Sequence, residues 1–307
     1  MPQKKNLKDW IIATRPWSLP ASAMAVIVAT MFMWWSAATQ GGIMNWQNAM
    51  LALLGMMLFQ LSGNLISDYH DYTHHVDKPG EESVQILTSG LFTKKEVLCY
   101  GITLLTVACA IGIVIFLRSG WITLPIGIVG ILLSVFYFWL KYHALGDLDI
   151  LLEYAVLPML GISYVVSSAP GVAGALYWPV LLPAALVGPV TVAILHANNA
   201  RDIPSDDVSG IKTFAMLIGL KASQWVYGIE TLGPHLVILA AIMLGWLPWT
   251  AAIALLSLPA ATKLNKEVAS LMHSQQPFSA IDQKTAALQM KFSLLLAAGL
   301  AIAAIIA

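Results

Sequence analysis

Charged residues are scarce in this chain. Asp, Glu, Lys and Arg together make up 10% of its 307 residues, whereas 58% of the residues are hydrophobic. No water-soluble core needs that much apolar sequence, and a membrane-spanning helix needs ~20 predominantly apolar residues. The chain supplies such runs repeatedly from near residue 17 to its last residue, and its mean hydropathy is +0.76. The composition therefore predicts an all-α, polytopic membrane protein that lies in the lipid bilayer.

Further absences narrow the functional class. The formal net charge is +0, so no overall basic field indicates a nucleic acid as a partner. Cys99 and Cys109 fall on one predicted helix about 15 Å apart, which is too far for a disulfide. The sequence contains no glycine-rich nucleotide-binding fingerprint and no motif for a covalent nucleophile. These absences disfavour nucleic-acid binding, nucleotide-dependent chemistry and covalent catalysis.

The apolar runs predict about nine spanning helices in a single domain, residues 1–307. A retained first helix is preferred to a cleaved signal peptide, because its apolar stretch is long and the resulting topology is consistent. The cytoplasmic amino-terminal segment is predicted to cover residues 1–15, and the long polar loops to cover 67–96 and 198–221. The predicted spans are 19–37, 48–66, 97–117, 121–140, 150–168, 177–197, 223–246, 248–262 and 288–307.

The placement of the basic residues predicts the orientation of these helices. If the amino terminus is cytoplasmic, 15 of the 16 Lys and Arg residues lie on inner segments, and only Arg118 lies on an outer one. Cytoplasmic loops of membrane proteins carry such an excess of Lys and Arg. The outer connections, Thr39–Trp46 and Ser167–Tyr177, carry no charge. Both polar stretches described next are therefore expected on the cytoplasmic side.

Two stretches share an outline in which an apolar segment ends in Asn-x-x-x-Asp followed by more aspartates. Asn64, Asp68 and Asp71 are spaced i, i+4 and i+7, so they project from one helix face. Asn198 and Asp202 repeat the spacing. Pro204 disfavours helix at Ile203, so Asp206 and Asp207 are expected past a break. The four helices between the two stretches suggest an internal duplication.

Two acidic helix ends that face each other would repel unless cations lay between them. Hard oxygen ligands of this kind suit Mg²⁺, which is commonly bound through a few carboxylates plus the phosphates of a substrate. The spacing therefore predicts a phosphorylated substrate with its magnesium. The expected metal ligands are Asp68, Asp71, Asp77, Asp202, Asp206 and Asp207.

At these motifs the chain resembles the UbiA-type intramembrane prenyltransferases, and within them the 1,4-dihydroxy-2-naphthoate polyprenyltransferases of menaquinone synthesis. Arg15-Pro-Trp-Ser-Leu-Pro-Ala-Ser resembles the opening RPxTLPAS of that branch, and Asn64 to Asp77 resembles NxxNDYxDxxxGxD. Leu145-Gly-Asp-Leu resembles its GLGE element. Leu195 to Ala215 is close to LHxNNLRDIxxDxxxGKRTLA, which is the most specific of these motifs. The resemblance extends almost from end to end of the chain.

The resemblance implies a nine-helix bundle with a central cavity, in which Mg²⁺ holds a polyprenyl diphosphate between the two aspartate motifs. It implies ionisation of the allylic diphosphate, attack by an aromatic ring and, in this branch, loss of the ring carboxylate to give demethylmenaquinone. It also implies a location in the bacterial inner membrane. Three positions depart from the pattern and leave the acceptor open, namely Ser67, His75 and Gln85.

Roles for further residues follow from charge and ring chemistry. Lys212, and next Arg201 and Lys141, are expected to neutralise the departing diphosphate. Aromatic faces stabilise carbocations, so Tyr137 is a candidate in catalysis and Tyr69 and Tyr72 are candidates in substrate binding, although packing is an equally simple role for each ring. Asn64 and Asn198 either bind substrate or form interhelical hydrogen bonds.

Two acidic residues fall within predicted apolar spans, where a carboxylate is costly, and so need a role. Glu153 is expected to contact the acceptor, whereas Glu230 has no predicted role. Two other functions stay open. One is a prenyl transfer to another aromatic or lipid acceptor. The other is a cation transporter, which is disfavoured because transporter sites lie near the bilayer midplane.

Overall fold

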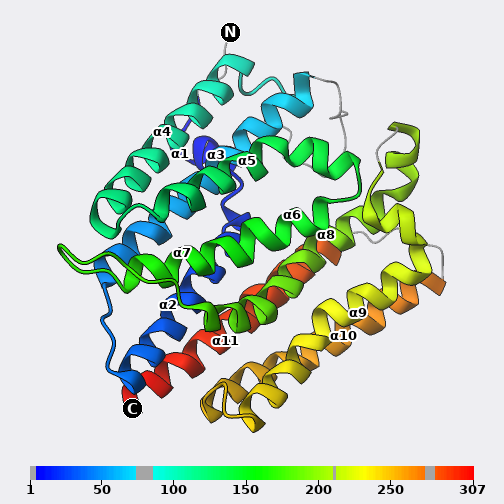
Figure 1. The fold of residues 1–307 in the computed structure, drawn as a ribbon. Coiled ribbons are helices and arrows are strands. Elements are labelled where there is room, and N and C mark those ends of the chain that lie inside the picture. Colours follow the sequence, from blue (N-terminus) through cyan, green and yellow to red (C-terminus); the bar gives the residue numbers. More distant parts are fainter. Residues whose placement is uncertain (1–4, 74–85, 210–211, 274–280) are drawn as a thin grey trace.

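The computed structural model of the protein describes residues 5–73, 86–209, 212–273 and 281–307. Within these ranges the side chains of Asp71, Phe138 and residues 204–209 and 272–273 are not described. Every named element in the described ranges is helical (Figure 1). The helices in chain order are α1 (Leu7–Ala13), α2 (Pro20–Gln40), α3 (Trp46–Thr73), α4 (Lys94–Ser119), α5 (Thr123–Tyr142), α6 (Gly146–Leu151), α7 (Leu157–Val166), α8 (Leu181–Ser209), α9 (Phe214–Met243), α10 (Leu258–His273) and α11 (Ile281–Ile306).

Shorter turns of helix extend several of these elements. The 3-10 turn η1 (Pro16–Ser18) precedes α2, and η4 (Trp249–Ser257) continues directly into α10. The π-helical turn η2 (Leu152–Val156) joins α6 to α7, so that these three elements form one span, Gly146–Val166. The 3-10 turn η3 (Trp178–Val180) precedes α8 in the same way. π-helical turns inside helices often occur near functional sites.

Local sequence accounts for several helix ends. Thr93 caps α4 in a capping box with Glu96, in which each side chain accepts a hydrogen bond from the other residue's backbone N–H. Gly41 ends α2 in the left-handed region at φ 75°, and its N–H donates to the carbonyl of Ala37 at 2.9 Å. The hydroxyl of Thr213 accepts from the N–H of Met216 and so begins α9.

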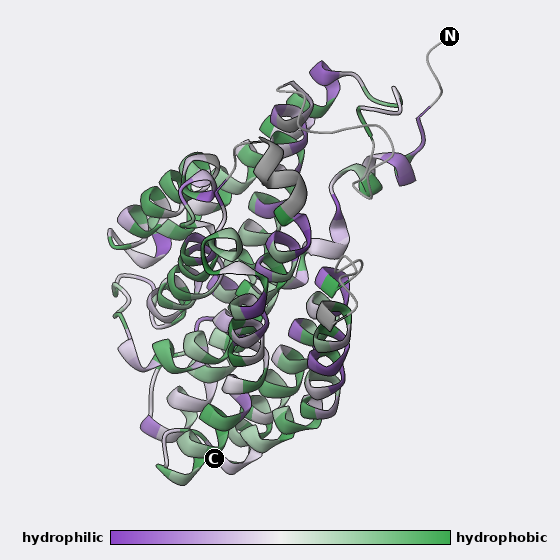
Figure 2. Cartoon of the chain, turned by 90° about the vertical axis from the view of Figure 1, so that its right-hand side faces the viewer, coloured by the Kyte–Doolittle hydropathy of each residue, from purple (hydrophilic) through white to green (hydrophobic). Residues whose placement is uncertain are grey.

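Seven helices in the described ranges are long and apolar enough to cross a membrane. A shorter apolar helix, Thr123–Tyr137, lies at the position of another predicted span. The multi-pass, all-helical class is thus confirmed, whereas the count of nine spans is not. Figure 2 shows hydrophobic residues along most of the length of the helices, and hydrophilic ones around the short amino-terminal helix. Many large hydrophobic side chains are also exposed on these helices, such as Leu117 of α4 and Val135 of α5, which suits a lipid environment.

The predicted break at Ile203 is wrong. Helix α8 continues through Pro204 to Ser209. A proline inside a helix removes one backbone hydrogen bond, and the neighbouring bonds can keep the helix continuous. Asp206 and Asp207 therefore lie on the same helix as Asp202, although their side chains are not described. Ser67–Thr73 likewise belongs to α3 rather than to a loop.

Helices α2, α8 and α11 form the centre of the bundle. Each of the three packs against the other two, and α2 also contacts α3 and α7. In Figure 1 the cyan end of α3 and the yellow-green end of α8 lie on the same side of the molecule, opposite the α2–α3 connection. The two helix ends that carry the aspartate motifs are therefore on the same side of the bundle.

A buried polar network joins the helices at the opposite end. The side chain of Asn48 is fully buried, and its Nδ2 donates to Ser119 Oγ at 3.1 Å, to the Val165 carbonyl at 2.9 Å and to Ser168 Oγ at 2.9 Å. Its Oδ1 accepts from Nε of Arg118 at 2.6 Å. This one amide thus connects the ends of α3, α4 and α7.

Replacing Asn48 with leucine should lower the free energy of unfolding by about 1–3 kcal/mol, because it leaves buried partners without their hydrogen bonds. The measurement is the unfolding midpoint of the purified variant in detergent. Gln47→Leu is the matched control, since Gln47 contacts the same Arg118 at 2.7 Å but in an exposed position. Equal midpoints for the two variants would contradict the role of Asn48.

Candidate functional site

Hydrogen bonds and an ion pair connect the end of α3 to the segment that leads into α2. Asp68 is 2% exposed and forms an ion pair with Arg15. Nδ2 of Asn64 donates to the Thr14 carbonyl and to Ser18 Oγ, at 2.9 Å each. One turn earlier, Nε2 of Gln60 donates to the Ser18 carbonyl at 2.8 Å. The predicted face of α3 therefore exists, and it holds the amino-terminal segment against the first motif.

Arg15 is a member of the site that sequence reasoning did not select. Its backbone lies in the left-handed region at φ 52°, which is unusual for a residue other than glycine. The chain turns there between α1 and η1 and so directs the guanidinium to Asp68. The available signal was the position of Arg15 immediately before Pro16, within one of the motifs noted above. In the sequence alone, Arg15 is one of the basic residues that predict the topology.

At the second motif, Arg201 is the centre of a polar cluster. Its Nε and NH2 atoms donate to the two carboxylate oxygens of Asp202 at 2.7 and 2.9 Å. Its NH1 atom donates to Asp282 at 3.3 Å, and its NH2 atom also contacts Oδ1 of Asn198. These contacts bring α8 to the first turn of α11. Asp202 is 35% exposed at its side chain, so this cluster is open to solvent.

Asp282 was also missed by the sequence analysis. The closing span was predicted to begin at residue 288, whereas α11 begins at Ile281. An acidic residue in the first turn of a helix is favourable in itself, so it carries little signal for a binding site. Only the fold places Asp282 beside Arg201.

A cavity of about 200 Å³ lies between the two motif helices. Gln60 of α3 and Asn198 of α8 face it, and Asp282 of α11 contributes to its wall. The remaining lining is mostly apolar and comes from α2, α6, η2 and α8, namely Ala21, Ile150, Tyr154, Thr191, Ile194 and Leu195. An apolar pocket with a few convergent polar groups is the usual form of a small-molecule site.

The other predicted residues are distributed around this cavity or away from it. Glu153 is 7% exposed and lies in the π-helical turn η2, next to the cavity-lining Tyr154. Tyr69 and Tyr72 pack in a second cluster with residues of α1 and the start of α4, and Nζ of Lys94 lies 5.1 Å from the Tyr72 ring centroid. Tyr137 and Lys141 lie toward the end of α5.

Several candidate ligands belong to side chains or residues outside the described part of the structure. Asp71 lies in the last turns of α3, and Asp206 and Asp207 lie in the last turns of α8, but their side chains are not described. Asp77 lies outside the described residues. Lys212 is exposed, and its carbonyl accepts from the N–H of Ala144 at 2.8 Å.

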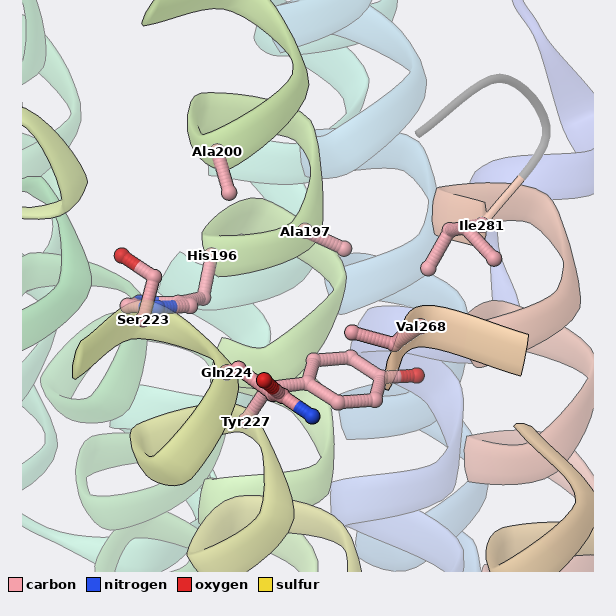
Figure 3. A pocket seen from close by; sticks show the side chains of 8 residues that line it. All are labelled: His196, Ala197, Ala200, Ser223, Gln224, Tyr227, Val268 and Ile281. Carbon is pink, nitrogen blue, oxygen red and sulfur yellow. The ribbon is translucent and has the colours of Figure 1, made fainter. Parts of the chain in front are cut away.

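A further polar cluster lies on the other side of α8. Ligand atoms of Asp147, His196 and Glu230 are within 4.8 Å of one another. His196 is fully buried, and its Nδ1 lies 2.9 Å from Oδ2 of Asp147. It also borders a small cavity of about 10 Å³ between α8, α9, α10 and α11 (Figure 3). Sequence reasoning noted Asp147 only within a motif and left Glu230 without a role.

The chain is similar to proteins of known family. Over 306 residues it is 28% identical to UbiA prenyltransferase domain-containing protein 1 of Xenopus tropicalis, an alignment that covers 98% of this chain and 84% of the relative. The human protein of the same name is 27% identical over 308 residues, with 98% and 85% coverage. These relatives are eukaryotic and their name specifies no acceptor. The finer assignment to dihydroxynaphthoate polyprenyltransferases and the bacterial location therefore stay predictions.

Solved structures share the fold. A UbiA homolog from Aeropyrum pernix K1 superposes with a TM-score of 0.67 at 14% identity, covering 90% of this chain and 97% of that one. A UbiA homolog from Archaeoglobus fulgidus bound to GPP and Mg²⁺ gives a TM-score of 0.60 at 14% identity, with 95% and 99% coverage. The model of the UbiA prenyltransferase family matches residues 25–295. The chain therefore belongs to the UbiA prenyltransferase family.

Proposed function

We propose that this protein transfers a polyprenyl group from its diphosphate to a hydroxylated aromatic acceptor in a Mg²⁺-dependent reaction, with 1,4-dihydroxy-2-naphthoate as the expected acceptor. The observation that carries the proposal is the cavity between α3 and α8, with an Asp–Arg pair at the end of each helix. Family membership and the Mg²⁺ and GPP bound to the Archaeoglobus homolog support the same chemistry.

The residues at the two helix ends fit a magnesium diphosphate. Asp68 and Asp202 offer hard carboxylate oxygens, which Mg²⁺ prefers. Each is paired with an arginine, so a bound metal would take over the carboxylate and free the guanidinium for phosphate oxygens. Mg²⁺ in this position would stabilise the negative charge that develops on the departing diphosphate.

The chain's own side chains would carry the remaining steps. Arg15 and Arg201 would bind the diphosphate and stabilise its charge as the allylic C–O bond breaks. The Tyr154 ring lines the cavity and is available to the carbocation, since cation–π contacts in dry sites are worth ~2 kcal/mol. Ile150, Ile194 and Leu195 would exclude water, which protects the cation from hydrolysis until the acceptor ring attacks.

The proposal includes a cytoplasmic position for both motifs and the amino terminus. The distribution of Lys and Arg supports this orientation. Lys141 and Lys212 would then add positive charge near the diphosphate, and the two segments that carry them are joined by the hydrogen bond between Ala144 and Lys212.

The test is a transfer assay with radiolabelled prenyl diphosphate and Mg²⁺ in membranes that contain the protein. Dihydroxynaphthoate, 4-hydroxybenzoate and a reaction without acceptor are compared. We expect a labelled, lipid-soluble product with dihydroxynaphthoate. Transfer only to 4-hydroxybenzoate would contradict the acceptor, and no transfer to any hydroxylated aromatic compound would contradict the proposed function.

A further inference from the structure

The first turn of α6 is hydrogen-bonded to the second aspartate motif. Oδ2 of Asp147 lies 2.9 Å from Nδ1 of His196. Oδ1 of the same carboxylate accepts a hydrogen bond from Nδ2 of Asn199 at 3.3 Å. The two partners are spaced i and i+3 on α8 and so lie on one face. His196 is fully buried, and Asn199 is 3% exposed. One carboxylate therefore fixes two neighbouring positions of the helix in a water-poor environment, where hydrogen bonds are strong.

The turn that precedes α6 makes a second connection. Ala144 lies in the left-handed region at φ 60°, which is unfavourable for a residue other than glycine. Its N–H donates to the carbonyl of Lys212 at 2.8 Å. Such a conformation persists when surrounding contacts hold it in place. The turn between α5 and α6 thus contacts the chain just after α8, and the first turn of α6 contacts α8 itself.

These contacts lie on the side of α8 that faces away from the reaction cavity. Asn198 lines the cavity between the motif helices, whereas His196 borders the small cavity toward α9. Figure 3 shows the His196 ring beside Ser223 of α9, with Ala197 and Ala200 along the same stretch of α8. His196 and Asp147 therefore act on the reaction site through α8, without touching the cavity.

We propose that Asp147 and His196 are positioning residues that set the rotation and height of the second aspartate motif. The inference rests on the proposed prenyl-diphosphate function. Rotation of α8 would move Asn198, Arg201 and Asp202 together, since they share its backbone. A site that holds a metal diphosphate tolerates little misplacement of its ligands. Groups that orient metal ligands from outside typically change metal affinity or activity 10–100-fold when mutated.

Glu230 lies near the hydrogen-bonded pair Asp147–His196 but does not take part in its hydrogen bond. Its carboxylate approaches Asp147 and His196 within 4.8 Å, yet its Oε2 atom has no hydrogen-bond partner among the described residues. Nδ1 of His196 and Oδ2 of Asp147 are already hydrogen-bonded to each other. The three side chains therefore fit a hydrogen-bonded Asp147–His196 pair with a neighbouring acid better than a three-ligand metal site.

Two substitutions of His196 distinguish a positioning role of this residue from a role in packing alone. The amide nitrogen of an asparagine side chain reaches the place of Nδ1, whereas that of glutamine reaches the place of Nε2. His196→Asn keeps a donor to Asp147, and His196→Leu removes it. We expect apparent affinity for Mg²⁺ and geranyl diphosphate to fall about tenfold in His196→Leu and to be largely kept in His196→Asn.

The measurement is the Mg²⁺-dependent rise in unfolding temperature of the purified, folded protein as geranyl diphosphate is added. Asp147→Asn is the second variant in case His196→Leu does not fold, and it should show the same weakening. Glu230→Gln is the matched control and should bind like the unmodified protein.

Three results would overturn the inference. One is unchanged affinity in a folded His196→Leu or Asp147→Asn variant. Another is a loss in His196→Asn as large as in His196→Leu. The third is an equal loss in Glu230→Gln, which would make the three side chains a single site. If the unmodified protein showed no Mg²⁺-dependent binding of geranyl diphosphate, the proposed function itself would fail.

Discussion

Replacing Asp202 with alanine should lower the rate of prenyl transfer by ~10²–10³-fold, the usual cost of removing a group that stabilises charge in the transition state. The substitution removes a hard oxygen ligand at the end of α8. It also frees Arg201 from its two hydrogen bonds to Asp202, and leaves it with Asp282 and Asn198. The arginine would then be drawn away from the diphosphate toward α11.

The measurement is turnover of the purified variant in saturating Mg²⁺, after its membrane insertion and unfolding temperature have been checked. Glu267→Ala is the matched control, because it also removes an acidic partner of a basic residue, Lys284, but outside the cavity lining. We expect turnover of the control close to that of the unmodified protein. Turnover near the unmodified level in Asp202→Ala would show that Asp202 does not hold the metal.

Removal of divalent cations should stop transfer completely and reversibly. Asp68, Asp202 and the substrate diphosphate all carry negative charge, and two unit charges of the same sign 4 Å apart repel by ~1 kcal/mol in water and ~4 kcal/mol near a protein surface. Arg15 and Arg201 are each already paired with one of these aspartates. Without a metal, Lys141 and Lys212 alone would not balance the negative charge of a diphosphate beside two aspartates.

The experiment is to treat the protein with EDTA, assay transfer, and then add back Mg²⁺ or Ca²⁺. Activity should return with Mg²⁺ and return poorly with Ca²⁺, which prefers more ligands at longer distances. Asp68→Asn should need a higher Mg²⁺ concentration, since it removes one charge from the ligand set. Transfer that continues at the original rate in EDTA would contradict a metal-dependent mechanism.

The spans show why some sequence predictions succeeded and others did not. Hydropathy is averaged over windows of ~20 residues, so α2 and α4 were predicted close to both of their ends. The polar end of α3, the polar end of α8 and the start of α11 lie outside the predicted spans. The count of nine is not confirmed at two positions. The predicted span 121–140 corresponds to the shorter apolar helix Thr123–Tyr137, and the predicted span 248–262 corresponds to the 3-10 helix η4 followed by the polar α10. The break at Pro204 was wrong because a local preference was weighed without the packing of α8.

The candidate site was likewise predicted only in part from the sequence. The spacing of Asn64 and Asp68 placed both on one face of α3, and the structure shows that face in contact with the segment around Ser18. The sequence could not show that the contact would be made by Arg15. Asn64 was weighed between substrate binding and a structural hydrogen bond, and its amide donates to the protein twice.

The sequence by itself determined the membrane class and the two acidic helix ends, because both depend on runs and spacings of a few to twenty residues. The tertiary structure alone decided which partners these ends have. Arg15 and Asp68 are 53 residues apart, Asp147 and His196 are 49 apart, and Arg201 and Asp282 are 81 apart. No periodicity extends over such separations. These pairs exist because α2 packs against α3, α6 against α8 and α8 against α11, which brings distant side chains within hydrogen-bonding distance.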